Sequence, residues 1–188
     1  MDAQLIWYTA RSSGIVAWAL LSASVLWGLA LSTRVLGKRP RPNWILDLHR
    51  FVGGAAVVFV GVHVVSMLLD TYVHFGLVDV LVPFATTWHP GAVAWGIVGL
   101  YLLLAVEITS LLRSRLSKRA WRAVHMLSFP LFVTSTVHLL TAGTDRSNPA
   151  LVGAAIAVTA AVALLTAVRI QEDTRKVGGT PKDIPSVV

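Results

Sequence analysis

The chain has 188 residues, of which 55% are hydrophobic and only 13% are charged, and its mean hydropathy is +0.71. This composition excludes a soluble globular domain and indicates an integral membrane protein whose main partner is lipid. The net charge of +7 does not indicate nucleic-acid binding, because the Lys and Arg residues stand in short groups between apolar segments.

Five apolar segments are long enough to cross a membrane, because about 20 apolar residues in a helix span about 30 Å of hydrocarbon. In chain order they are expected near residues 13–33, 44–70, 91–112, 120–141 and 149–170. The expected fold is an all-α, five-helix transmembrane bundle over residues 1–170, followed by a flexible cytoplasmic tail over the polar residues 171–188. No G-x-G-x-x-G motif follows a strand pattern, so we expect no flavin or nicotinamide domain in this chain.

The positions of Lys and Arg predict how the bundle is oriented. Basic residues gather after the first, third and fifth segments: Arg34, Lys38, Arg39 and Arg41; Arg113, Arg115, Lys118, Arg119 and Arg122; Arg169, Arg175, Lys176 and Lys182. Residues 71–90 contain no Lys or Arg but many apolar residues, which predicts a segment at the outer interface that roofs the bundle. Because cytoplasmic loops accumulate positive charge, we expect the N-terminus outside and the C-terminus inside a bacterial cytoplasmic membrane.

Four histidines lie inside these apolar segments as two pairs of similar spacing. His49 and His63 are 14 positions apart in the second segment, and His125 and His138 are 13 positions apart in the fourth. Ionisable side chains are costly in a bilayer, so such residues mark a functional site. Both helices run from inside to outside. His49 and His125 therefore share an inner level, and His63 and His138 share an outer level about 20 Å away.

This arrangement predicts two haem b groups, with one iron between His49 and His125 and the other between His63 and His138. Two imidazole ligands leave no open coordination position and favour electron transfer. The absence of cysteine excludes thiolate-ligated haem, iron–sulfur clusters held by this chain and covalent c-type attachment. On a straight helix His138 would face about 140° away from His125. Pro130 lies between them and is expected to kink or rewind the helix.

Several residues near the histidines are candidates for contacts with haem. Arg50 and Arg122 stand beside the inner ligands, where haem propionates need cationic partners, although positive-inside topology explains these arginines equally well. Arg146 is the main basic choice at the outer level. Three glycines of the second helix would let a porphyrin approach closely, or would serve helix packing alone: Gly53, Gly54 and Gly61.

Four other residues near these levels carry specific expectations. Glu107 is the deepest acidic residue and is expected to pair with Arg113 or another basic residue, the alternative being proton movement near a quinone. Trp121 is expected to anchor a helix end at the membrane interface. Phe129 and Phe132 are expected in the core between the two histidine levels.

The segments Leu-Asp-Leu-His49-Arg50-Phe-Val-Gly-Gly through His63, and Trp121-Arg-Ala-Val-His125 through His138, resemble the ferric-reductase-like transmembrane domain family. That superfamily includes ferric reductases and NADPH oxidases. The resemblance covers roughly residues 10–170 and implies a helical bundle that carries b-type haem and moves electrons across the membrane. We expect this chain to differ from the eukaryotic members in having no cytoplasmic FAD/NAD(P)H domain. It is therefore expected to be an oxidoreductase component that depends on a quinone or a partner's flavin.

The leading interpretation is a di-haem b cytochrome that passes electrons from an inner flavoprotein or quinol to an outer acceptor, either ferric iron or a periplasmic redox partner. A second interpretation is a cytochrome b anchor subunit of a quinone-linked dehydrogenase, which needs a peripheral catalytic partner. A third, from a different class, is a haem-free transporter or proton-conducting bundle in which the histidines relay protons. Haem content separates the third interpretation from the other two.

Overall fold

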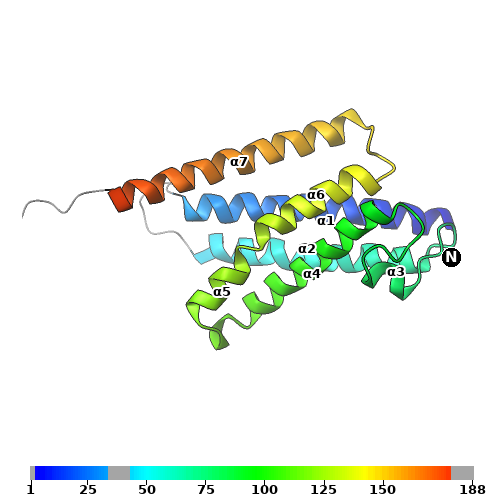
Figure 1. Ribbon diagram of the computed structural model, residues 1–188, viewed down its shortest axis with the longest axis horizontal. Coiled ribbons are helices and arrows are strands. Elements are labelled where there is room, and N and C mark those ends of the chain that lie inside the picture. Colours follow the sequence, from blue (N-terminus) through cyan, green and yellow to red (C-terminus); the bar gives the residue numbers. More distant parts are fainter. Residues whose placement is uncertain (1–2, 34–42, 179–188) are drawn as a thin grey trace, which may run out of the picture.

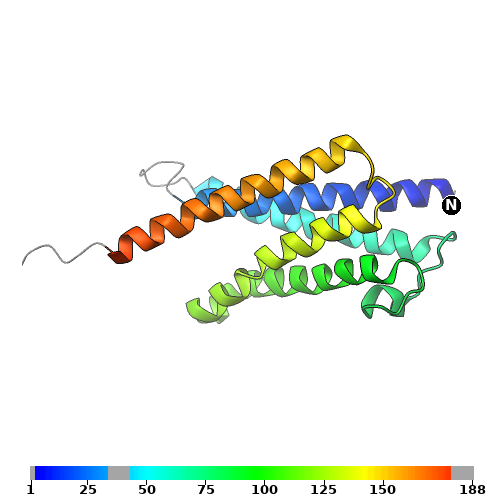
Figure 2. The same cartoon turned by 45° about the horizontal axis from the view of Figure 1, so that its top comes forward.

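The computed structural model describes residues 3–33 and 43–178, and in these ranges the chain is helical with short connections and no strand. The elements are α1 (Ala3–Ser32), α2 (Asn43–Leu69), α3 (Leu77–Leu81), α4 (Pro90–Leu111), the 3-10 turn η2 (Arg113–Arg115), α5 (Lys118–His125), α6 (Ser128–Ala142) and α7 (Pro149–Gly178). The long helices run side by side along one axis, with α3 at one end and α5 at the other (Figures 1 and 2).

Among the described residues, five helical segments are long and apolar enough to cross a membrane: Ala3–Ser32, Asn43–Leu69, Pro90–Leu111, Lys118–Ala142 and Pro149–Arg175. The prediction of an all-α multi-pass membrane protein with five apolar helices is thereby confirmed.

Two helices are longer than expected from the sequence. α1 already begins at Ala3, and α7 continues to Gly178, so residues 171–178 are helical. The extension of α7 has a simple cause, because Gln, Glu, Arg and Lys are polar but form helices well. The rest of the expected tail, residues 179–188, and the basic residues from Arg34 to Arg41 lie outside the described residues.

The long helices pack as two pairs, α1 along α2 and α4 along α6, and α1 also contacts α6 and α7. Apolar side chains from both pairs and from α7 meet in one core: Leu21, Val25, Leu29, Leu103, Leu131, Phe132 and Val162. Phe129 packs against this core, so the two phenylalanines of α6 lie where the sequence predicted. This core fills the bundle with apolar groups.

The fourth membrane segment is interrupted at residues 126–127, between α5 and α6. Pro130 explains the position, because it has no N–H to donate to the carbonyl of Met126, four residues earlier, and its ring would clash with that carbonyl in a continuous helix. The N–H of Phe129 bonds to the Met126 carbonyl instead, at 3.2 Å, which makes a tighter turn. The interruption expected from Pro130 is therefore present, and it follows directly after His125.

The connection between α2 and α4, called the outer connection after the predicted orientation, covers one end of the bundle (Figure 1). Apolar side chains on and after α3 are exposed, as suits an interfacial segment: Leu77, Val78, Leu81, Val82 and Phe84. Phe75 and Trp88 point inward and pack edge to face, with ring centres 5.9 Å apart, beside Val93 and Ile97 of α4. Tyr101 of α4 donates a hydrogen bond to the Leu81 carbonyl and fastens α3 to α4.

Candidate functional site

The structure brings the four histidines of the apolar segments together as two pairs, and each pair joins α2 to the α5–α6 segment. His49 of α2 faces His125 of α5, with ring centres 6.1 Å apart and ring planes at 75°. His63 of α2 faces His138 of α6, with ring centres 6.3 Å apart and ring planes at 76°. The two pairs therefore have nearly the same geometry, although α5 and α6 are separate helices.

Both separations suit a metal ion held between two imidazoles. A metal–nitrogen distance of about 2.0–2.1 Å on each side, with about 1.1 Å from each nitrogen to its ring centre, puts the ring centres about 6.2–6.4 Å apart if the two nitrogens lie on opposite sides of the metal. The separation of 6.3 Å lies in this range and that of 6.1 Å lies just below it. No hydrogen bond joins the two rings of either pair in the part of the chain that the structure describes. The pairs are spaced as two axial ligands of one iron would be.

The pair of His63 and His138 is called the outer pair, and that of His49 and His125 the inner pair, after the orientation predicted from the sequence. At the outer pair, backbone carbonyls of neighbouring helices hold the Nδ1 atoms. His63 Nδ1 donates to the carbonyl of Ala10 on α1 at 2.7 Å, and His138 Nδ1 donates to the carbonyl of Ala92 on α4 at 2.8 Å. Because a carbonyl only accepts, each neutral ring carries its proton on Nδ1 and keeps its lone pair on Nε2. Metal-bound histidines have such partners, which fix the tautomer and the ring orientation.

The inner pair is held differently. His49 Nδ1 lies 3.3 Å from Oγ of Ser24 on α1, whereas His125 Nδ1 is buried and has no hydrogen-bond partner among the described residues. His125 stacks on the indole of Trp121, with ring centres 5.0 Å apart and planes at 22°. The guanidinium of Arg113 lies over the same indole, 4.5 Å from its centre. The prediction of Trp121 as an interfacial anchor missed its contact with the site.

Glycines of neighbouring helices make room for three of the four rings. A Cβ added at Gly96 would lie 2.7 Å from the nearest ring atom of His138. The corresponding distances are 3.0 Å from Gly14 to His63 and 3.3 Å from Gly28 to His49. Gly14 and Gly28 are both on α1 and are 14 positions apart, the same interval that separates the two histidines of α2. Sequence reasoning missed all three glycines, although this matched interval was a usable signal.

The glycines that the sequence singled out on α2 do not contact the rings. Nothing lies within 4 Å of a Cβ added at Gly54 or Gly61, and a Cβ at Gly53 would lie 2.9 Å from Oε1 of Glu107 on α4. The ion pair expected between Glu107 and Arg113 does not form, because Arg113 lies over the indole described above. The small residues that touch the imidazole rings lie on α1 and α4, and a close approach of porphyrin to the glycines of α2 stays a prediction.

The two arginines predicted to contact haem are exposed beside the inner pair. Arg50 follows His49 on α2, and its Nη1 lies 3.2 Å from Oδ1 of Asp47. Arg122 is exposed on α5. Their contact with propionates stays a prediction.

A cavity of about 270 Å³ lies at the outer pair, and both His63 and His138 line it. Its walls come from α1, α2, α4, α6 and the segments that cover the outer end, and they are mostly apolar. Among the described residues that line it, Arg11 is the single Lys or Arg, and Arg146 is absent from the lining. The structure therefore adds Arg11 as a candidate cation beside this cavity, and a propionate contact of Arg146 stays a prediction.

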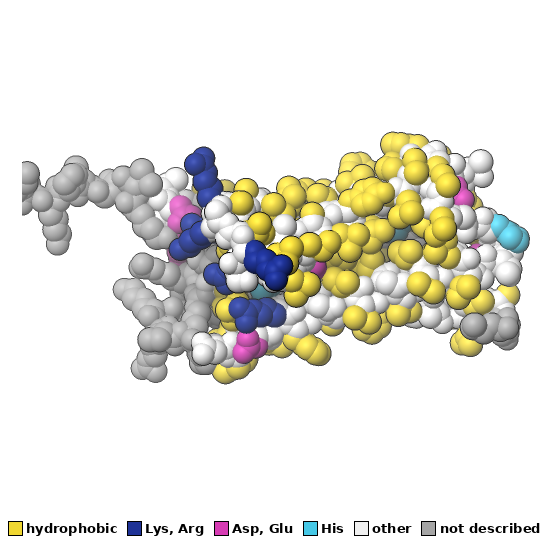
Figure 3. Space-filling view, turned by 90° about the horizontal axis from the view of Figure 1, so that it is seen from below, with side chains coloured by type: hydrophobic (Ala, Val, Ile, Leu, Met, Phe, Trp, Pro, Cys, Tyr) yellow, Lys and Arg dark blue, Asp and Glu magenta, His cyan; other side chains and the backbone are white. Residues whose placement is uncertain are grey.

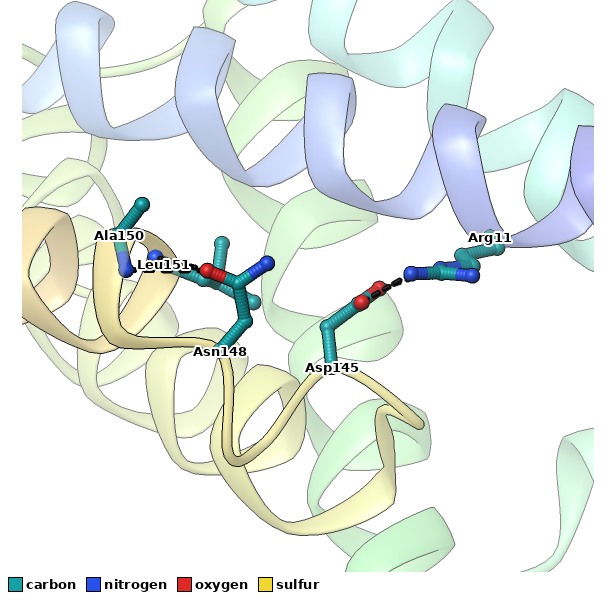
Figure 4. Close-up of polar contacts among 5 residues, drawn as sticks. All are labelled: Arg11, Asp145, Asn148, Ala150 and Leu151. Atoms are coloured by element: carbon teal, nitrogen blue, oxygen red, sulfur yellow. Dashed lines mark hydrogen bonds and ion pairs between the residues drawn. The ribbon is translucent and has the colours of Figure 1, made fainter.

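Arg11 is held in place by an ion pair that joins two distant parts of the chain. Its Nε and Nη2 both bond to the carboxylate of Asp145, which lies in the connection between α6 and α7 (Figure 4). Asn148 in the same connection accepts hydrogen bonds from the N–H groups of Ala150 and Leu151 and so caps the start of α7. The ion pair and the cap together fix the connection beside the cavity.

The remaining two histidines lie in the outer connection, away from both pairs. His74 and His89 have left-handed backbone conformations, with φ of 57° and 42°, and the His89 ring packs edge to face against Trp88. The described residues contain no group of three or more His, Cys, Asp or Glu side chains arranged around a metal ion. A site with two axial imidazoles needs only two protein ligands.

Comparison with known proteins supplies the family. Residues 13–136 match the family described as ferric reductase like transmembrane component, a range that contains His49, His63 and His125 and ends two positions before His138. The chain is also similar to the Protein-methionine-sulfoxide reductase heme-binding subunit MsrQ of Rhodospirillum rubrum, at 28% identity over 189 residues, which cover 91% of this chain and 86% of the relative. No solved structure matches the chain. The chain belongs to the ferric reductase-like transmembrane component family.

Proposed function

We propose that this chain is a di-haem b-type cytochrome that passes single electrons across a bacterial cytoplasmic membrane. The observation that carries the proposal is the equal geometry of the two imidazole pairs, at 6.1 Å and 75° and at 6.3 Å and 76°. The 14 positions between the two histidines of α2 separate the pairs by about 21 Å along the helix. Haem bound by two imidazoles would supply one-electron transfer without an open position for oxygen.

The donor atoms and the surrounding groups fit haem b at both levels. His49 with His125 are the proposed inner ligands, and His63 with His138 are the proposed outer ligands. The Nδ1 bonds of His63 and His138 leave Nε2 as the ligating atom. Glycines beside the rings remove the side chains that would push the imidazoles out of position. The apolar core of the bundle excludes water from the interior.

Charged residues are the proposed partners of the haem propionates. Arg11 lines the outer cavity and uses two of its five N–H donors on Asp145, so the other donors remain for a second carboxylate. At the inner level Arg50 and Arg122 keep this role as proposals. Asp145 would act by holding the guanidinium in a fixed orientation.

The charge distribution supports an N-terminus outside and a C-terminus inside. Figure 3 shows Lys and Arg side chains on one face gathered toward a single end of the bundle, with hydrophobic side chains covering the rest of its length. Residues 71–90, at the opposite end, contain no Lys or Arg. By the positive-inside rule the basic end is cytoplasmic. The pair of His49 and His125 is then the inner one, and the cavity with Arg11 lies toward the outside.

The electron donor and acceptor are proposed to be separate molecules. A flavoprotein or a quinol would deliver electrons at the inner side, and ferric iron or a periplasmic redox protein would accept them outside. The similarity to a heme-binding subunit of a methionine sulfoxide reductase favours a reductase protein as the partner. A cytochrome b anchor of a quinone-linked dehydrogenase is the second candidate, since it would use the same two imidazole pairs.

A haem-free proton relay is less well supported. In a relay each imidazole must exchange protons at both nitrogens, whereas carbonyl oxygens hold the Nδ1 protons of His63 and His138. Equal spacing of both pairs at a metal-bridged distance also has no use in a relay.

Haem content and optical spectra test the proposal. Protein purified from cells with sufficient haem is expected to contain two haems per chain and to give a low-spin reduced b-type spectrum. His63→Ala and His125→Ala are each expected to remove one haem, whereas His74→Ala, in the outer connection, keeps both. Protein without a Soret band would refute haem binding, and a single haem would refute the di-haem path. Vesicles offered quinol or reduced flavin then identify the class of donor.

A further inference from the structure

Three of the four paired histidines are oriented by a polar contact at Nδ1, and His125 is the exception. His63 and His138 bond to carbonyls, and His49 lies against the hydroxyl of Ser24. The buried Nδ1 of His125 has no partner among the described residues. An imidazole bound to a metal only through Nε2 remains free to rotate about the metal–nitrogen bond unless its second side is held.

His125 also occupies a weak position in the backbone. It is the last residue of α5, and the chain breaks its helical pattern immediately afterwards. A helical side chain leans back over the preceding turn, so the residues three and four positions before His125 are the ones that can restrict its ring. Since Nδ1 has no hydrogen-bond partner among the described residues, a side chain of that turn is the candidate for orienting the ring.

Trp121 provides that contact. It precedes His125 by four positions, which places the two side chains on the same face of α5, and the rings stack at 5.0 Å with planes at 22°. Arg113 lies over the indole at 4.5 Å and restricts it in turn. The indole Nε1 is buried and has no hydrogen-bond partner among the described residues. The stacked ring face is thus the contact that the indole makes with the site.

We propose that Trp121 is a positioning residue that sets the plane of the His125 imidazole at the inner site. The inference rests on the proposed haem function, and it assigns to a stacked ring the role that carbonyls have at the outer site. The two devices give the same result, because the ring planes stand at 75° in the inner pair and 76° in the outer pair. Without the indole, the His125 imidazole would have neither a hydrogen bond nor a stacked ring among the described residues to hold it at this angle.

The angle between axial imidazole planes can be measured by electron paramagnetic resonance of the oxidised protein. Nearly perpendicular planes on low-spin ferric iron give a signal with a large maximal g value, and rotation toward parallel planes lowers that value. This signature depends on ligand orientation and not on whether the protein is merely folded. It is therefore suited to a residue that acts through its ligand.

The experiment compares Trp121→Phe, Trp121→Leu and the matched control Trp44→Leu in the full chain, each with haem content measured. Trp44 is 60% exposed on α2. A His63→Ala sample, which retains only the inner pair, assigns the inner signal. We expect Trp121→Phe and Trp44→Leu to keep both large-g signals, since phenylalanine still stacks. Trp121→Leu is expected to shift the inner signal to a lower maximal g value and to leave the outer signal unchanged.

The other possible results of this experiment either overturn or support the positioning role of Trp121. An inner signal in Trp121→Leu identical to that of the unmodified chain would overturn the inference, and so would loss of the inner haem in Trp121→Phe, because the indole N–H would then be the important group. Loss of the inner haem in Trp121→Leu with retention in Trp121→Phe supports the need for a stacked ring. Absence of any low-spin haem signal in the unmodified chain refutes the proposed function itself, which is a different result.

Discussion

Replacing Gly96 by alanine is expected to remove the outer haem and to leave the protein folded. Gly96 lies on α4 against the ring of His138, four positions after Ala92, whose carbonyl holds the Nδ1 of that ring at 2.8 Å. The ring therefore rests directly on the backbone of α4. An added methyl group has to displace it.

The size of the displacement follows from the structure. The new Cβ would lie 2.7 Å from Cε1, 2.8 Å from Nδ1 and 3.0 Å from Nε2 of His138. Non-bonded carbon atoms normally stand about 3.5–4.0 Å apart, so the ring would have to move by about 1 Å. Metal–ligand distances tolerate only about 0.2 Å. Disturbing such ligand support costs about 10–100-fold in metal affinity, or about 1.4–2.7 kcal/mol.

The effect on folding has the opposite sign. Alanine is favoured over glycine in a helix interior by about 0.8–1.0 kcal/mol, and without haem the imidazole can turn aside. We therefore expect Gly96→Ala to reach the membrane in normal amounts, with one haem per chain in place of two. The measurements are haem per chain and thermal unfolding of the purified protein.

Related glycines provide a graded series and a control. The nearest ring atom would be 3.0 Å from a Cβ at Gly14 and 3.3 Å from one at Gly28, so haem loss should decrease from Gly96→Ala to Gly14→Ala to Gly28→Ala. Gly153→Ala on α7 is the matched control, because nothing lies within 4 Å of a Cβ added there. Two fully occupied haems in Gly96→Ala, or greater loss in Gly28→Ala than in Gly96→Ala, would show that the reasoning is wrong.

Three further predictions concern residues around the sites. Arg11→Ala is expected to lower the outer haem content about 10-fold or more. Asp145→Asn should lower it less, because the guanidinium remains. Equal haem content in both variants and in the unmodified chain would contradict a propionate role for Arg11. Pro130→Ala should restore a continuous helix and raise the helical circular dichroism signal. It should also remove one haem, because His125 and His138 would then face different sides of the helix. Retention of both haems would contradict this prediction. Gly53→Ala should keep both haems, although its new Cβ would lie 2.9 Å from Oε1 of Glu107, because a flexible carboxylate moves away more easily than a ligated ring. Haem loss comparable to that of Gly96→Ala would contradict this difference between a carboxylate and a ring as neighbours.

Local sequence was sufficient to predict that the chain is a membrane protein and which helices carry the histidines. Five long apolar segments stand out because each must satisfy its backbone inside lipid as a helix. The histidine intervals were equally visible, since ionisable groups are rare in such segments. The helical repeat also showed that His138 faces away from His125 on a straight helix, and Pro130 explained in advance why the helix is not straight.

The cation beside the outer cavity is one that the sequence pattern overlooked. The first apolar segment was expected to begin near residue 13, so Arg11 fell outside it, and Arg146 was named as the main basic choice for the outer propionates, a role that stays a prediction. In the structure α1 begins at Ala3, and its added turns bring Arg11 to the carboxylate of Asp145 and into the lining of the cavity. Hydropathy underestimates a helix whose end is polar, because polarity and helix formation are separate properties.

The sequence by itself determined that this is a membrane bundle with histidines at two levels, because apolar length and the intervals between histidines are properties of single helices. Only the tertiary structure decided what surrounds each ring: the carbonyls of Ala10 and Ala92, the glycines of α1 and α4, and the indole of Trp121. Most of these contacts join residues far apart in the chain, and they depend on how each helix is rotated about its axis and packed against its neighbours. That rotation is set by the packing of all the helices together, and no interval within one segment records it.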